Sequence, residues 1–284
     1  MAASVAVMVL VAALLHSIWN AVAKAIPDRL AASSLISLAH LAAGSVGILI
    51  FPMPAVESWP YLAASTAIQS AYLLILTASY KHGDFSQVYP LARGSAVVLI
   101  AGGAGVFLGE TLTPLQSLAT LAVAGALIAL AFVGSPSGKV SGSRRGAAFA
   151  LLTGAAIAGY SLVDGTGARE SGSPLGYAMW LFALQGVVVL GICWLRAPDR
   201  SALLGSVRTW WRIGMFGGVL SLISYAIVVW AQTLAPLALV SALRESSVLL
   251  AGVIGFLFFK ERFSKRRAVL TAIAVAGIAT LQLG

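Results

Sequence analysis

Long apolar runs follow one another along almost the entire chain and restrict its fold more than any other feature. Hydrophobic residues make up 60% of the 284 residues and charged residues only 10%, whereas about 25% of a soluble domain is charged. A helix that crosses the hydrocarbon core of a bilayer needs about 20 apolar residues. Because the runs are continuous rather than short and alternating, they predict an all-α integral membrane fold and not a β-barrel. Ten transmembrane helices are expected, at 3–25, 31–52, 59–81, 86–108, 113–134, 146–166, 174–195, 212–234, 237–259 and 266–284.

The second half of the chain repeats the placement of rare charged residues in the first half. A shift of 151 positions superimposes Arg244 on Arg93 and Glu261 on Glu110. In each half an apolar helix carries one Arg near its start, and a Glu follows 17 residues later. This pattern predicts an internal repeat within a single transmembrane domain, 1–284. The expected divisions are a first five-helix repeat at 1–134, an inter-repeat loop at 135–145 and a second five-helix repeat at 146–284.

The basic residues are distributed unevenly between the loops. Of the 18 Lys and Arg residues, 15 lie in loops that follow odd-numbered helices, and only Arg169 lies in a loop on the other side. Since cytoplasmic loops are enriched in Lys and Arg, the odd-numbered loops are predicted to face the cytoplasm and both termini the outside. Five helices is an odd number, so the two halves cross the membrane in opposite senses and form an inverted repeat. The formal charge of +9 is thus interpreted as a topology signal near anionic headgroups, and nucleic acid is not an expected partner.

Two short motifs resemble those of a known family. Gly109 and Glu110 close the fourth helix, and the first helix carries Trp19 and Asn20 followed by Lys24. With the five-plus-five inverted arrangement, they resemble the drug/metabolite transporter superfamily and, within it, the ten-helix EamA-like transporters, over essentially the whole chain. The resemblance implies ten helices around a central cavity that moves small metabolites such as amino acids. It leaves the direction open, because exporters, exchangers and importers share this fold.

Polar side chains of the first helix are candidates for contact with a substrate, because ionisable groups at membrane depth are costly and usually face a cavity. His16, Asn20 and Lys24 stand at i, i+4 and i+8 and share one helix face, with Trp19 beside them. The alternative is structural: hydrogen bonds to a neighbouring helix for His16 and Asn20, and a headgroup contact for Lys24.

The two repeated arginines are the second set of candidates. Arg93 lies one turn after Tyr89 in the fourth helix, and Arg244 precedes Glu245 in the ninth. Guanidinium groups suit carboxylates and phosphates, so these arginines are predicted to bind a substrate with an anionic group or to act in gating. The alternative is that each one pairs with helix-end carbonyls or an acid and holds the repeats in register.

Further candidates lie near the centres of other helices. Asp164, one turn after Tyr160, is a predicted partner for Arg244. Glu245 is a less natural partner for Arg244, since adjacent residues point in different directions on a helix. Aromatic walls with a few polar groups are typical of small-molecule cavities. The remaining candidates for such a cavity are Gln69, Tyr72, Trp180, Gln185 and Tyr225.

These features predict a multi-pass secondary transporter of the cell (inner) membrane that works by alternating access. The expected activity is export of a small polar metabolite such as an amino acid or related organic anion. The alternatives are uptake or exchange of an organic anion or phosphonate-type metabolite and, least favoured, an integral-membrane enzyme, for which no catalytic motif is present. The expected partners are the lipid bilayer and a small-molecule substrate, with protons as a coupling ion through His16. The lone Cys193 excludes an internal disulfide and a Cys-based metal site; no cofactor is expected, and a monomer is favoured over a dimer.

The charge bias makes a direct prediction about topology. In a Cys193→Ala background, a cysteine introduced at position 284 should react with an impermeant reagent in intact cells. A cysteine at position 265 should react only after permeabilisation, because the 260–267 loop is predicted to be cytoplasmic. The reverse labelling pattern would exchange inside and outside throughout.

Overall fold

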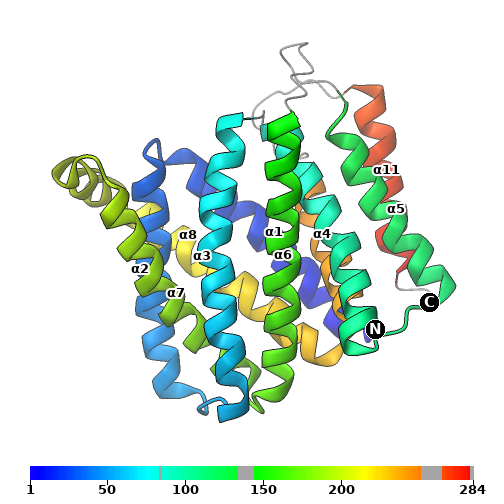
Figure 1. The fold of residues 1–284 in the computed structure, drawn as a ribbon, viewed down its shortest axis with the longest axis horizontal. Coiled ribbons are helices and arrows are strands. Elements are labelled where there is room, and N and C mark those ends of the chain that lie inside the picture. The colour runs from blue at the N-terminus through cyan, green and yellow to red at the C-terminus, as the bar shows by residue number, and fades with distance from the viewer. Residues whose placement is uncertain (83–84, 134–143, 251–263, 282–284) are drawn as a thin grey trace. The chain divides into compact units, whose positions relative to one another are not determined.

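A computed structural model describes residues 1–82, 85–133, 144–250 and 264–281 of this chain (Figure 1). Every regular element within these ranges is a helix. The elements are α1 (Ala3–Ala25), α2 (Arg29–Ile50), the short 3₁₀ helix η1 (Val56–Ser58), α3 (Trp59–His82), α4 (Phe85–Leu108), α5 (Pro114–Leu130), α6 (Arg144–Glu170), α7 (Pro174–Arg196), α8 (Arg200–Leu234), α9 (Leu237–Arg244) and α11 (Lys265–Thr280).

Six of the helices in the described ranges are long and apolar enough to cross a membrane, namely α1, α2, α4, α6, α7 and α8. Large apolar side chains on their surfaces are exposed: Leu49 is 86% exposed, and Val106, Phe107 and Leu195 are each 78% exposed. Such surfaces are unfavourable in water and suit hydrocarbon. The all-α membrane fold is therefore confirmed, and the full number of ten crossings stays a prediction.

Two predicted spans differ from the observed helices. The eighth span was expected to begin at residue 212, but α8 begins at Arg200. The Asp199 carboxylate caps the helix there, because it accepts hydrogen bonds from the backbone N–H groups of Ser201 at 2.8 Å and of Ala202 at 3.2 Å. A further bond from the Ser201 hydroxyl, together with these two, holds the pKa of Asp199 below its usual value.

The predicted ninth span is interrupted. Its first part, α9, ends at Arg244, and residues 246–250, the last described residues of this segment, are helical again. The backbone N–H of Glu245 is shared between the carbonyls of Ser241 and Ala242, both at 3.2 Å. The rest of this span (251–259), Lys260 and Glu261, residues 135–143 of the inter-repeat loop and residues 282–284 lie outside the described residues.

The helices form two compact units, and each unit contains segments of both sequence halves. The first unit comprises Met1–Leu10, Ala71–Leu162 and Leu234–Gly284, and the second comprises Val11–Ser70 and Val163–Thr233. Helices α1, α3 and α6 contribute to both units.

In the second unit, α2 packs along α7 through glycine positions. A Cβ at Gly44 would lie 2.8 Å from both the Ala183 nitrogen and the Met179 oxygen, and one at Gly186 would lie 2.8 Å from the Ser37 oxygen. These glycines allow the two backbones to approach closely, as small residues do between helices in membranes.

In the first unit, α5 packs against α4, from the first half of the sequence, and against α11, from the second half. Figure 1 shows α5 beside α11. Glycines again mark the contacts. A Cβ at Gly94 of α4 would lie 2.9 Å from the Ala124 oxygen, and one at Gly277 of α11 would lie 3.1 Å from the Ala119 oxygen. Helix α9 packs against both α4 and α5.

The Gly109–Glu110 pair has a structural role in this unit. Gly109 takes a φ of 65°, and the Glu110 N–H donates to the Ala104 carbonyl at 3.1 Å, which terminates α4. The Glu110 carboxylate then accepts a hydrogen bond of 2.8 Å from the backbone N–H of Leu237, the first residue of α9. A carboxylate at this position accepts a hydrogen bond from an N–H that has no partner within the helix. Its negative charge also interacts favourably with the positive end of the helix dipole.

Candidate substrate-binding site

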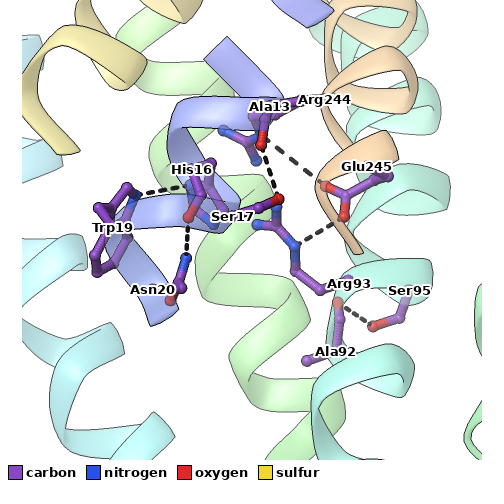
Figure 2. A network of polar contacts seen from close by, with 10 residues as sticks. All are labelled: Ala13, His16, Ser17, Trp19, Asn20, Ala92, Arg93, Ser95, Arg244 and Glu245. Atoms are coloured by element: carbon purple, nitrogen blue, oxygen red, sulfur yellow. Dashed lines mark hydrogen bonds and ion pairs between the residues drawn. The ribbon is translucent and has the colours of Figure 1, made fainter. Parts of the chain in front are cut away.

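The first unit contains a buried cluster of three charged side chains (Figure 2). Arg93 comes from α4, Arg244 ends α9, and Glu245 occupies the turn that follows. The Nε atom of Arg93 lies 2.8 Å from Glu245 Oε2, and the Nε atom of Arg244 lies 3.9 Å from Glu245 Oε1. The three residues are only 5%, 4% and 1% exposed, respectively. One carboxylate therefore serves two buried guanidinium groups.

Three tyrosines accompany this cluster. The Arg93 guanidinium lies 5.9 Å from the centre of the Tyr89 ring, one turn earlier on α4, within the range of a cation–π interaction. Tyr72 of α3 and Tyr160 of α6 pack edge to face, with ring centres 5.8 Å apart, and both interact electrostatically with Arg93. The cluster thus combines fixed positive charge with aromatic walls and neutral hydroxyl groups.

The charge of the cluster is not balanced by its own residues. Two guanidinium groups and one carboxylate leave a net charge of +1, and no other acidic side chain of the described residues forms an ion pair with either arginine. The Nη2 atoms of both arginines have no hydrogen-bond partner within the same residues. Uncompensated buried charge and unmade hydrogen bonds are costly, so this arrangement suits an incoming anion.

The second unit contains a separate polar network around Asp164 of α6, which is fully buried. One carboxylate oxygen accepts a hydrogen bond from the Tyr177 hydroxyl of α7 at 3.0 Å. The other accepts from the amide of Gln69 of α3 at 3.2 Å and from the hydroxyl of Tyr225 of α8. Gln185 of α7 extends the network by donating to the Gln69 amide oxygen at 2.8 Å. Four helices are thereby joined to one carboxylate.

The polar residues of α1 contact one another (Figure 2). The Trp19 indole N–H donates to His16 Nδ1 at 3.3 Å, and the Asn20 amide donates to the His16 backbone oxygen at 2.7 Å. Because Nδ1 accepts a hydrogen bond, the imidazole is neutral in this geometry and carries its proton on Nε2. Lys24, farther along the same face, is exposed.

The structure sorts the candidates predicted from the sequence into these groups. Trp180 joins none of the polar groups and packs on Trp59, with ring centres 5.0 Å apart. The pairing of Arg244 with Asp164 concerns residues of different units and stays a prediction. The contact of Glu245 with Arg93 was not expected from the sequence.

Two buried polar residues were missed by the sequence analysis. Tyr177 looks like an ordinary aromatic residue in the first turn of an apolar helix, and no local pattern connects it with Asp164. His40 of α2 is 8% exposed and packs on Phe182 with ring centres 4.9 Å apart. A histidine within an apolar run was the available signal, the same signal that drew attention to His16.

The helices and the buried charges define a multi-pass membrane protein with ionisable groups inside its spans. Residues 144–282 match the model of the EamA-like transporter family. The match covers this segment of the chain and indicates a membrane transporter of the drug/metabolite type. Because members of this family are transporters, the match favours transport over the enzyme alternative.

One solved crystal structure, whose name describes no function, is similar across 100% of this chain and 98% of its own, with 16% sequence identity and a TM-score of 0.72. At that identity the likeness shows the fold alone. No curated protein matches the chain.

The Asp164 network predicts a coupling between two side chains. Tyr177→Phe removes one donor to a buried carboxylate and should lower the free energy of unfolding by about 1.5–3 kcal/mol, seen as a lower melting temperature in detergent. In an Asp164→Asn background the same change should cost clearly less. Equal losses in the two backgrounds would mean that the Tyr177 hydroxyl does not act through Asp164.

Proposed function

We propose that this protein is a secondary transporter for a small polar metabolite that carries an anionic group, such as an amino acid or a related organic anion. The observation that carries the proposal is the Arg93–Arg244–Glu245 cluster, with two guanidinium groups around one carboxylate and free Nη2 atoms in the described residues. Guanidinium forks bind carboxylates and phosphates in two-pronged geometry, and the neighbouring tyrosines supply the aromatic surface that small-molecule sites contain.

Alternating access between two inverted five-helix repeats, 1–134 and 146–284, is the mechanism we propose. Within the units, two of the packed helix pairs that join the two sequence halves have the most extensive contacts, α2 with α7 and α5 with α11, and α4 with α9 is a third such pair, whereas α5 also touches α9. Each of the first three pairs joins helices at corresponding places in the two predicted repeats, as expected for halves related by a pseudo-twofold axis. The interruption at Glu245 also supports the proposal, because transporters often bind substrates where a helix is broken.

Direction, membrane and assembly are part of the same proposal. We propose export from the cytoplasm by a monomer in the cell (inner) membrane, with both termini outside. Uptake or exchange of an organic anion or phosphonate-type metabolite is the alternative, and a dimer is the alternative assembly. Counterflow in liposomes of defined orientation separates these directions, and light scattering in detergent gives the mass of the assembly.

A screen of ligands tests the proposed substrate class. Anionic metabolites should raise the melting temperature of the purified protein, since a ligand that binds the folded state stabilises it. Arg93→Gln should weaken that binding by about 100-fold, equivalent to about 2.7 kcal/mol. Arg208→Gln, which changes an exposed arginine of α8, should leave it unchanged.

Two results would contradict this proposal. If anions stabilise Arg93→Gln as strongly as the wild type, the cluster does not bind the substrate. If a bound compound is chemically converted rather than returned intact in counterflow, the protein is an enzyme.

We further propose that His16 couples transport to protons. Histidine is the residue type whose ordinary pKa, about 6.5, lies nearest neutrality. A proton added to His16 Nδ1 would break the 3.3 Å hydrogen bond from Trp19, so the charge on the imidazole and the position of the indole would change together.

His16→Gln should therefore keep the fold and flatten the pH dependence of transport between about pH 5.5 and 8.5. Rates in liposomes at equal protein incorporation provide the measurement, and the melting temperature provides the control for folding. A lower melting temperature with an unchanged pH profile would instead assign His16 a structural role in helix packing.

A further inference from the structure

We propose that Glu245 determines the charge selectivity of the arginine cluster, by holding the site at a single positive charge so that it prefers a monoanionic group to a dianionic one. This inference rests on the proposed function, because it concerns the anion that the same two arginines bind. Beyond the proposed function, it specifies the substrate class as monoanions, such as monocarboxylates. It also assigns specificity to Glu245, a residue that is not itself expected to bind the anion.

The geometry places Glu245 between the two arginines rather than beside one of them. Its Oε2 atom faces Arg93 Nε at 2.8 Å, and its Oε1 atom faces Arg244 Nε at 3.9 Å. Each carboxylate oxygen is thus directed to the Nε side of a different guanidinium. The Nε and Nη2 atoms of both arginines and both Glu245 oxygens have no hydrogen-bond partner in the described residues, so the two contacts with Glu245 are ion pairs. Nη2 shares one edge of the guanidinium with Nε, but its second N–H points away from that edge. An anion bound by this second N–H would leave Glu245 in place, and the carboxylate would continue to contribute its negative charge.

The side chains around the cluster do not alter this charge. Among the described residues, the tyrosines near the cluster, Tyr72 of α3, Tyr89 of α4 and Tyr160 of α6, add no formal charge. Helix α5, which packs against α9, carries no charged or titratable residue between Pro114 and Leu130. The described residues of this cluster consequently set its charge at +1.

Because buried net charge is costly, the site charge of +1 determines whether a monoanion or a dianion is preferred. A bound monoanion brings the site to zero, whereas a bound dianion brings it to −1. Net charge in a buried site is costly because the surroundings cannot solvate it as water does. Removing the carboxylate would raise the charge to +2, which a dianion balances and a monoanion does not.

A series of variants with different site charge tests the inference. Glu245→Gln gives +2, Arg244→Gln gives 0, and the double variant Arg244→Gln/Glu245→Gln returns the site to +1. Butyrate and succinate are suitable probes, because both have four carbons and near neutral pH they carry one and two negative charges. The ratio of their dissociation constants is measured by calorimetry or by ligand-induced thermal shift on the purified full-length protein.

The wild type should bind butyrate more tightly than succinate, and Glu245→Gln should shift the ratio towards succinate by at least about 10-fold, or about 1.4 kcal/mol. The double variant, matched to the wild type in charge, should return towards the wild-type preference with weaker binding of both probes. If Glu245→Gln does not fold, the comparison of Arg244→Gln with the double variant carries the test, because these two proteins differ only at residue 245. Removal of the carboxylate in the double variant should strengthen binding of succinate more than that of butyrate, since each interaction of a dianion with the site charge is doubled.

The outcomes separate this inference from the function on which it rests. If the wild type binds neither probe, the cluster is not a site for small anions, and both proposals are overturned. If it binds them but the ratio stays unchanged in Glu245→Gln, or is the same in Arg244→Gln and the double variant where the first variant does not fold, then only the role of Glu245 is overturned.

Discussion

A backbone amide inside a bilayer has no water to bond, and this constraint governs the whole structure. Each segment within the membrane must satisfy its own N–H and C=O groups, which the α-helix does. The free groups that remain at helix ends receive polar caps: Asp28 on α2, Thr113 on α5 and Ser173 on α7 accept bonds from the N–H groups of their first turns. At α9 the cap comes from a distant part of the chain, the Glu110 carboxylate.

The same constraint explains how the buried ionisable groups are arranged. Asp164 is stabilised by neutral donors, two tyrosine hydroxyls and one amide, which spread around both of its oxygens. Arg93 and Arg244 instead share one carboxylate and keep a positive charge that their own residues do not balance. In the first arrangement both carboxylate oxygens accept hydrogen bonds. In the second a positive charge remains unbalanced within the cluster, which is why we propose that the cluster binds the substrate.

Part of the candidate site could be predicted from the sequence. The repeat drew attention to Arg93 and Arg244, because arginine is rare inside membrane spans and both occupy the same position in their halves. The sharing of Glu245 could not be predicted, since residues adjacent to each other on a continuous helix point in different directions, and the helix is in fact interrupted there. The donors to Asp164 lie 13, 61 and 95 positions away, so no local pattern joins them.

The sequence by itself determined the helical membrane fold and the approximate limits of most helices, because apolar run length and continuity follow directly from the thickness and low polarity of the bilayer. It also located the end of α4 at the Gly109–Glu110 pair and the start of α7 at residue 174. Tertiary structure decided which polar groups meet: Glu245 with both arginines, Tyr177 with Asp164, and Glu110 with the start of α9. These contacts depend on how helices distant in sequence pack, and packing between apolar helices is set by the shapes of small residues along their whole length rather than by any short motif.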